Sequence, residues 1–169
     1  MVFKSKAVPA PNPQTAKEPD AKYLTQPRYL LDVNVWVALF DSAHIASTRA
    51  NAFIETSLIH IATCPMVENG VIRILNLPNY GKRGALGIQL VRNQLIKACR
   101  SMDHQFWPDD ISLRDESSVD FSRVYGHNQI TDLYLLALAV KHDGVLVTFD
   151  QNIPISSVHG AQPKHLLIL

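Results

Sequence analysis

The sequence predicts an α/β fold with a mostly parallel β-sheet, formed by a single domain. Short runs rich in apolar and β-branched residues alternate along the chain with longer segments whose apolar residues recur at helical spacing. This alternation is typical of parallel sheets flanked by helices. A chain of 169 residues with 47% apolar content is long enough for one well-cored domain and too short for two.

The expected domain covers residues 28–169 and follows a proline-rich N-terminal extension, residues 1–27. Half of the chain's ten prolines lie in this extension, at positions 9, 11, 13, 19 and 27. The segment has almost no apolar periodicity, so it cannot bury enough surface to offset the entropy cost of ordering it. It is either a docking arm or an ordinary tail, and its composition favours the tail.

The first half of the domain alternates strands with helices. A strand is expected at 29–31, a helix at 33–40, a helix at 43–55, a strand at 57–63 and a helix at 65–75. Asp41 and Ser42 end the first of these helices and cap the second. Pro65 suits the opening turn of the third, because a proline there loses no helical hydrogen bond.

The second half begins with a glycine-containing loop and ends with a strand. A loop is expected at 76–87, a helix at 88–102, an extended segment at 106–107 followed by a turn, a short helix at 117–125, a helix at 132–142, and strands at 145–149 and 165–169. Thr131 is a good N-cap residue for the helix at 132–142, which is the strongest helix pattern in the chain.

Composition argues against several classes of protein. The net charge of +1 gives no general sign of nucleic-acid binding, which would have to come from a local basic patch. Cys64 and Cys99 fit no zinc or redox spacing and are expected to be reduced, structural residues, which favours a reducing compartment. The N-terminus does not resemble a signal peptide, and the longest apolar run, 133–140, is less than half of the ~18 residues that a membrane span needs. A cytoplasmic protein is therefore expected.

Four carboxylates are predicted to meet at one edge of the sheet. Asp32 and Asp150 each directly follow an expected strand, and the carboxyl ends of parallel strands share one edge. Glu68 and Asp132 lie in the opening turns of helices, which start at that same edge in a βαβ unit. Each acid alone has an ordinary explanation as a turn residue or as a charge that complements a helix dipole. The four together favour a site.

Such a cluster needs a cation, because converging carboxylates repel one another. Oxygen-only ligands suit Mg²⁺ or Mn²⁺, and Mg²⁺ typically keeps several bound waters. A hydrated divalent ion can lower the pKa of a water molecule and stabilise charge on a phosphodiester. The chemistry indicated is metal-assisted phosphodiester hydrolysis, with water rather than a side chain as the nucleophile.

Four sequence blocks carry a family resemblance. They read LLDVNVW (30–36), PMVENGVIRI (65–74), ITDLYLLALA (130–139) and VTFD (147–150). In order and spacing these blocks resemble those of the PIN-domain ribonucleases, and within them the VapC-type toxins of bacterial toxin–antitoxin modules. The resemblance implies a PIN-like fold over residues 28–169, with a central parallel sheet of about five strands, and a Mg²⁺- or Mn²⁺-dependent endoribonuclease activity.

The resemblance also implies roles for individual residues and for partners. Asp32 and Asp132 would be the principal metal ligands, while Glu68 and Asp150 would ligate through water or orient the attacking water. Positions that support the site by hydrogen bonds or an added polar group are matched by Asn34, Thr148 and Asn152. Such toxins are usually homodimers, and a VapB-type antitoxin blocks the site with a C-terminal segment that often inserts a basic side chain among the carboxylates.

An acidic centre that binds a polyanion should be surrounded by basic groups. The candidates for RNA contacts are Arg73, Lys82, Arg83, Arg92 and His127, with Arg49 as a weaker one. Tyr125 offers a surface on which an unpaired base can stack. Trp36 and Phe53 are expected in the core or at a dimer interface. The histidines without metal spacing, expected at structural or surface positions, are His44, His60 and His104.

Three alternatives stay open on the sequence alone. A haloacid-dehalogenase-type phosphatase also places an Asp after its first strand, but it needs a second acid two residues later, where this chain has Asn34, and a downstream lysine that is not evident. A non-catalytic PIN-like scaffold that binds RNA or protein would have no reason to hold four repelling carboxylates together. A housekeeping PIN nuclease would share the same site, and only a neighbouring antitoxin gene would separate it from a toxin.

Overall fold

The computed structural model describes residues 27–55, 59–81 and 84–169, so nearly all of the N-terminal extension lies outside these ranges. Within them, five strands form one sheet in which every neighbouring pair is parallel. The strands are β1 (Tyr29–Leu31), β2 (His60–Thr63), β3 (Asp103–Phe106), β4 (Val145–Thr148) and β5 (Leu166–Ile168). The predicted α/β class and parallel sheet of about five strands are confirmed.

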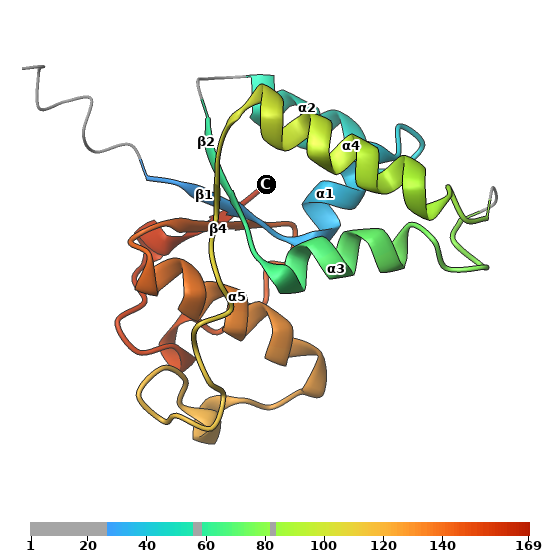
Figure 1. Ribbon diagram of the computed structural model, residues 1–169. Helices are drawn as coiled ribbons and strands as arrows, with labels where there is room; N and C mark the ends of the chain where they lie inside the picture. The colour runs from blue at the N-terminus through green and yellow to red at the C-terminus, as the bar shows by residue number, and fades with distance from the viewer. Residues whose placement is uncertain (1–26, 56–58, 82–83) are drawn as a thin grey trace, which may run out of the picture.

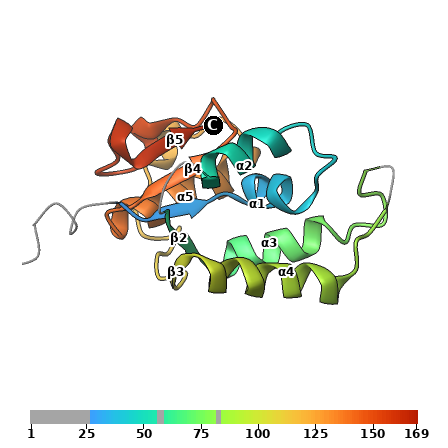
Figure 2. The same cartoon turned by 90° about the horizontal axis from the view of Figure 1, so that it is seen from above.

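Helices cover both faces of this sheet. The α-helices of the described chain are α1 (Val33–Phe40), α2 (Ser47–Glu55), α3 (Pro65–Ile74), α4 (Ile88–Ser101) and α5 (Ile130–Lys141). Short 3₁₀ helices are η2 (Phe121–Arg123), η3 (His127–Gln129), η4 (Ile155–Ser157) and η5 (Pro163–His165). In Figures 1 and 2, α1 to α4 lie together on one side of the strands and α5 lies on the other.

The strand order β3-β2-β1-β4-β5 places a switch point between β1 and β4. The chain steps outward from β1 to β2 to β3, and then returns past β1 to β4. Because crossovers between parallel strands are right-handed, this reversal moves the next helix, α5, to the opposite face. In open α/β sheets the crevice outside the carboxyl ends of the strands at such a point is where ligands bind.

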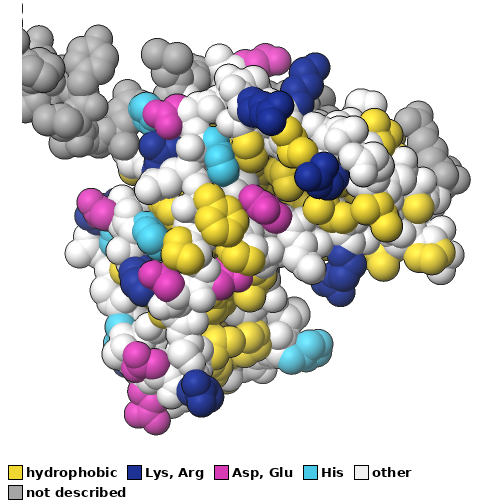
Figure 3. All heavy atoms as spheres, in the orientation of Figure 1, with side chains coloured by type: hydrophobic (Ala, Val, Ile, Leu, Met, Phe, Trp, Pro, Cys, Tyr) yellow, Lys and Arg dark blue, Asp and Glu magenta, His cyan; other side chains and the backbone are white. Residues whose placement is uncertain are grey.

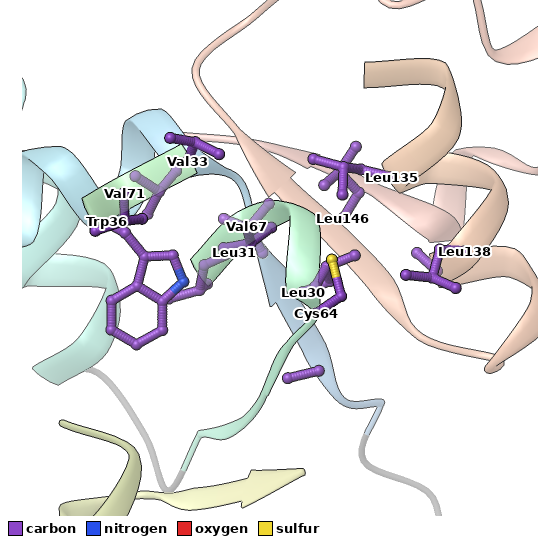
Figure 4. Packing of buried hydrophobic residues seen from close by; sticks show 14 of the residues in the cluster. Leu30, Leu31, Val33, Trp36, Cys64, Val67, Val71, Leu135, Leu138 and Leu146 are labelled. Atoms are coloured by element: carbon purple, nitrogen blue, oxygen red, sulfur yellow. The ribbon is translucent and has the colours of Figure 1, made fainter. Parts of the chain in front are cut away.

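The core includes β1 and β4, which lie between the two helix layers. The side chains of Leu30, Leu31 and Leu146 are at most 1% exposed, as expected for strands covered on both faces. Figure 4 shows Trp36 of α1 on one side of these strands and Leu135 of α5 on the other. The complete burial of Trp36 confirms its expected place in the core.

Two helix boundaries differ from the sequence prediction. The helix expected at 43–55 begins only at Ser47, because the preceding residues form turns. In these turns the backbone N–H of His44 donates to the Asp41 carbonyl oxygen at 2.9 Å, and the Asp41 carboxylate accepts from Ala43 N–H at 3.0 Å. Such local bonds compete with a helix for the same backbone groups.

The predicted N-cap of α5 is wrong. The helix starts at Ile130, ahead of Thr131, because η3 runs directly into it and its N-cap residue is Gln129, which makes no side-chain cap bond. Further along the chain, β4 ends at Thr148, so Phe149 lies beyond the strand.

Two segments between α4 and α5 were also predicted imperfectly. The strand β3 was located too late, at 106–107, because its sequence DHQF shows little apolar character at the sheet edge. The short helix expected at 117–125 is reduced to the 3₁₀ helix η2, since Val119 pairs with Val158 in an isolated antiparallel bridge. Elsewhere the expected elements agree with the structure to within a few residues, although Ser57 and Leu58 of the second strand lie outside the described ranges.

The start of α1 approaches the middle of α3 closely. A Cβ atom on Gly70 would lie 2.6 Å from Cγ2 of Val33, so only glycine permits this spacing without a shift of the neighbouring side chain. The contact holds the helix that carries Glu68 against the helix that Asp32 caps. Among the described residues, both cysteines are free thiols, and no helix is long and apolar enough to cross a membrane.

Candidate active site

Asp32 lies at the end of β1 and is only 4% exposed. It caps α1, because its Oδ1 accepts a hydrogen bond of 2.6 Å from the backbone N–H of Val33. Its Oδ2 accepts a bond of 3.1 Å from the Thr148 hydroxyl on the neighbouring strand. Burial raises the pKa of Asp32 above its ordinary value, and these hydrogen bonds partly offset that effect. The carboxylate is therefore fixed in orientation but costly to charge.

Thr148 links Asp32 to Asp150. Its hydroxyl oxygen, while donating to Asp32, accepts a bond of 3.1 Å from the backbone N–H of Asp150. The Asp150 carboxylate in turn accepts a bond of 2.7 Å from the backbone N–H of Asn152. The backbone of Asn34 also lowers the pKa of Asp32. The side chains of Asn34 and Asn152 are exposed, and the recorded bonds of both residues to the acids involve their backbone N–H groups.

Asp132 completes a group of three interacting carboxylates. Its pKa is raised to about 6, first by partial burial and then by repulsion from Asp32 and Asp150. The three acids come from the ends of β1 and β4 and the first turn of α5, which surround the switch point. The structure therefore brings three of the four predicted acids into electrostatic contact at the predicted edge.

Glu68 is held on the other side of β1. Its Oε1 accepts a bond of 2.7 Å from the hydroxyl of Thr63, the last residue of β2. That hydroxyl also lies 2.8 Å from Nε2 of His104 on β3. The charge of Glu68 acts on the pKa values of His104 and Cys99, and it is not among the causes that raise the pKa of Asp32 or Asp132. Among the described residues no recorded contact joins Glu68 to the three aspartates, so its place beside them stays a prediction.

Sequence reasoning did not identify Thr63 and His104. Thr63 ends its strand at the same edge as Asp32, which is the one indication in the sequence that it belongs near the site. His104 comes from a strand that sequence analysis placed too late, and it was expected to be a structural or surface residue.

The donor set suits a hard divalent cation. Three interacting carboxylates supply oxygen ligands alone, which is the chemistry of Mg²⁺ and Mn²⁺. An ion would also relieve the repulsion that raises the pKa of Asp132. In the described part of the chain, no three His, Cys, Asp or Glu side chains are already gathered tightly enough to hold a metal. Asp150 is exposed and Asp132 half-exposed, so these two side chains are the ones free to turn toward an ion at Asp32.

Comparison with known proteins identifies the family. The family model described as "PIN domain" matches residues 29–157. This chain belongs to the PIN-domain family. It is 40% identical to Ribonuclease VapC44 of Mycobacterium tuberculosis (strain ATCC 25618 / H37Rv) over 143 residues, which cover 84% of this chain and 99% of that protein. From the same strain, Ribonuclease VapC29 is 34% identical, with 78% and 90% covered, and Ribonuclease VapC38 is 37% identical, with 73% and 86% covered.

Membership of this family leaves the dehalogenase-type phosphatase without support. The resemblance drawn from the four sequence blocks is confirmed, both for the PIN domain and for the VapC proteins within it. The three aspartates at the switch point all lie within the matched part of the chain.

The basic residues predicted to contact RNA occupy several elements of the PIN domain. Exposed candidates are Arg73 in the last turn of α3, Arg92 on α4 and His127 at the start of η3, while Lys82 and Arg83 lie outside the described residues. Tyr125, just before η3, is 89% exposed. Figure 3 shows Lys and Arg side chains among apolar ones over the arm formed by α3 and α4, and a hollow between this arm and the start of α5.

Arg49 is the basic group that the structure ties to the end of β4. Its guanidinium lies 4.8 Å from the centre of the Phe149 ring, in a cation–π contact. Phe149 directly precedes Asp150, so this contact places Arg49 near the end of β4, one residue along the chain from that acid. The residue that the sequence supported least among the basic candidates therefore has a clear structural link to the site.

The start of α3 is also held by Asp109, which lies in a loop distant in sequence. The N-cap residue of α3 makes no side-chain cap bond, and instead the backbone N–H of Met66 donates to Oδ2 of Asp109 at 3.1 Å. Burial, and after it the Asp109 carboxylate, raise the pKa of Tyr134 on α5 to about 12. Asp109 therefore lies between the starts of the two helices that carry Glu68 and Asp132.

Removing this distant cap is expected to destabilise the fold. The Asp109→Ala variant should lose about 1 kcal/mol of unfolding free energy, as for other lost N-caps, whereas Asp109→Asn keeps an acceptor oxygen and should lose less. Urea unfolding measures both, and Glu116→Ala, which removes another exposed acid, serves as the control. Equal midpoints for Asp109→Ala and the wild type would show that the contact does not support α3.

Proposed function

We propose that this PIN-domain protein is a Mg²⁺- or Mn²⁺-dependent endoribonuclease, the toxin of a VapBC-type toxin–antitoxin module. The proposal is supported by the relatives, which are ribonucleases of the VapC group. The observation that carries it is the placement of Asp32, Asp132 and Asp150 around the switch point of the sheet, where neighbouring aspartates raise the pKa values of Asp32 and Asp132. Repelling carboxylates in a crevice are expected where a cation is to be bound.

The residues of the site would have different roles in hydrolysis. Asp32 and Asp132 would hold the ion directly, with Asp150 acting on it directly or through water. When bound, the ion lowers the pKa of a water and neutralises charge on the phosphodiester. Thr148 keeps the Asp32 carboxylate in one orientation, and its bond to the Asp150 backbone keeps the two acids at a constant spacing. Glu68 would act from the β2 side, on the attacking water.

The partners follow from the same charges. A basic side chain of a VapB-type antitoxin, inserted among the aspartates, would relieve their repulsion much as a metal does. We further propose that the protein works as a homodimer in the cytoplasm, that residues 28–169 form the PIN domain, and that residues 1–27 are an extension outside the catalytic unit.

The test is cleavage of structured RNA by the purified protein with Mg²⁺, Mn²⁺ or EDTA. Internal cleavage with either ion and none in EDTA is the expected result. Cleavage that persists in EDTA would contradict metal dependence. RNA that is bound but left intact with both ions would favour a non-catalytic scaffold. Loss of growth inhibition in cells when a neighbouring antitoxin gene is co-expressed separates a toxin from a housekeeping nuclease.

Arg49 is expected to bind the RNA backbone. The Arg49→Ala variant should raise the KM for RNA about tenfold and change kcat little, because a phosphate contact outside the reacting centre contributes to binding of substrate and transition state alike. Steady-state cleavage at several salt concentrations measures this, and the salt dependence should weaken. Arg114→Ala, at an exposed loop position, is the matched control. A variant with unchanged KM and salt dependence would exclude this role.

A further inference from the structure

We propose that Thr63 and His104 are positioning residues that set the orientation of Glu68 in the proposed nuclease. The inference rests on the proposed function. It assigns to the Glu68 carboxylate a fixed place on the β2 side of the site, whereas the three aspartates come from the ends of β1 and β4 and the start of α5. It also assigns a role to His104, which has no metal-ligand spacing and is not part of the group of carboxylates.

The hydrogen-bond directions follow from the number of protons available. A threonine hydroxyl has one proton, and Thr63 donates it to Oε1 of Glu68 at 2.7 Å. The contact of 2.8 Å between the same oxygen and His104 Nε2 must then run the other way, with Nε2–H as donor. The result is a directed chain from His104 through Thr63 to Glu68.

The chain is built on rigid elements. Thr63 is fully buried at the end of β2, and His104 lies on β3, which pairs with β2 along its whole length. A buried hydroxyl held by two partners cannot rotate freely, so it fixes the carboxylate that it contacts. Among the described residues, none donates a recorded hydrogen bond to Oε2 of Glu68, which leaves that oxygen for a water or an ion.

Without the hydroxyl, no residue in the described part of the chain makes a recorded hydrogen bond to the Glu68 side chain. Glutamate has three rotatable side-chain bonds, and α3 carries Glu68 in its first turn with the side chain only partly buried. Partners that orient the groups around a metal commonly contribute 10- to 100-fold to affinity or activity. A similar contribution is expected from Thr63, and a smaller one from His104, which acts one bond further away.

The experiment is a double-mutant cycle between Thr63→Val and Glu68→Ala in the full chain. Thr63→Val removes the hydroxyl with little change of shape. It should slow single-turnover RNA cleavage by about 10- to 100-fold and weaken Mn²⁺ binding, measured by calorimetry without RNA. Thr63→Ser, which keeps the hydroxyl, should stay within about threefold of the wild type. In the Glu68→Ala background, Thr63→Val should have no further effect on either quantity.

His104 is tested by a pair of variants of different hydrogen-bonding capacity. His104→Gln can place an N–H donor near the position of Nε2 and should retain most activity, whereas His104→Leu should slow cleavage. Ser47→Ala, which removes another buried hydroxyl at the start of α2, is the control and should cleave normally. Urea unfolding of each variant separates loss of fold from loss of positioning.

The possible failures are distinguishable. Wild-type activity in Thr63→Val, or an equal loss caused by this change with and without Glu68, would overturn the inference while leaving the nuclease intact. A wild-type protein that cleaves no RNA with Mn²⁺ would instead overturn the proposed function.

Discussion

Replacing Asp32 with Asn is expected to lower the rate of metal-dependent RNA cleavage about 10³-fold or more. A bound divalent ion contributes several kcal/mol to stabilising the transition state, and each 1.36 kcal/mol is a factor of ten in rate. Asp32 has the central place in the site, since it is bonded to Thr148 and electrostatically coupled to both other aspartates. Single-turnover cleavage at saturating Mg²⁺ or Mn²⁺ measures the effect.

This loss should not come from unfolding. An Asn at this position can still cap α1, because its amide oxygen accepts the bond from Val33 N–H as the carboxylate does. The matched control is Asp115→Asn at an exposed turn, where the same change leaves the site untouched. An Asp32→Asn protein that cleaves RNA within tenfold of the wild type would remove Asp32 from the metal site.

Removing the charge of Asp132 is expected to stabilise the metal-free protein at high pH. The pKa of about 6, against the ordinary 3.8, means that the folded state binds a proton more readily than the unfolded state does. By linkage, this group destabilises the fold above pH 6, and the penalty disappears as the pH falls toward 4. It amounts to on the order of 2 kcal/mol once solvent screening is allowed for.

The measurement is urea unfolding of the wild type and Asp132→Asn between pH 4.5 and pH 8 in EDTA. The variant should be more stable at pH 8, and the gap should close at the acid end. The comparison is needed because His104 and His165, whose pKa values burial lowers, change stability in the opposite direction as the pH falls. Mg²⁺ at pH 8 should stabilise the wild type more than the variant. A difference in unfolding free energy between the two proteins that stays constant across this range would mean that the pKa of Asp132 is not raised in the folded state.

The pattern of apolar residues in the sequence predicted much of the fold. The strands β1 and β4 are covered on both faces, so their apolar runs are unmistakable, and the aspartates that follow them could be placed at one edge by topology alone. Edge strand β3 has no such pattern, because most of its residues face solvent. The start of α5 was misplaced because a 3₁₀ turn continues into the helix and replaces a capping side chain.

The candidate site divides in the same way. Positions fixed by strand ends and helix starts could be predicted. The sequence therefore indicated correctly that Asp32, Asp132 and Asp150 lie close enough to interact. The direction in which Glu68 points depends on His104, a residue 36 positions later on a strand that the pattern did not locate correctly. Contacts between residues so far apart in sequence cannot be inferred from local periodicity, and the cap that Asp109 provides to α3 was missed for the same reason.

The most direct test of the metal site is calorimetric titration of Mn²⁺ into the metal-free protein at pH 8. All three aspartates are expected to be deprotonated at this pH. The wild type should bind the ion, and Asp32→Asn, Asp132→Asn and Asp150→Asn should each weaken binding at least tenfold. Binding by the wild type should also weaken at pH 5, because Asp132 is then largely protonated. A wild type that does not bind Mn²⁺ would contradict a cation site formed by these carboxylates. So would three variants that each bind Mn²⁺ as tightly as the wild type does.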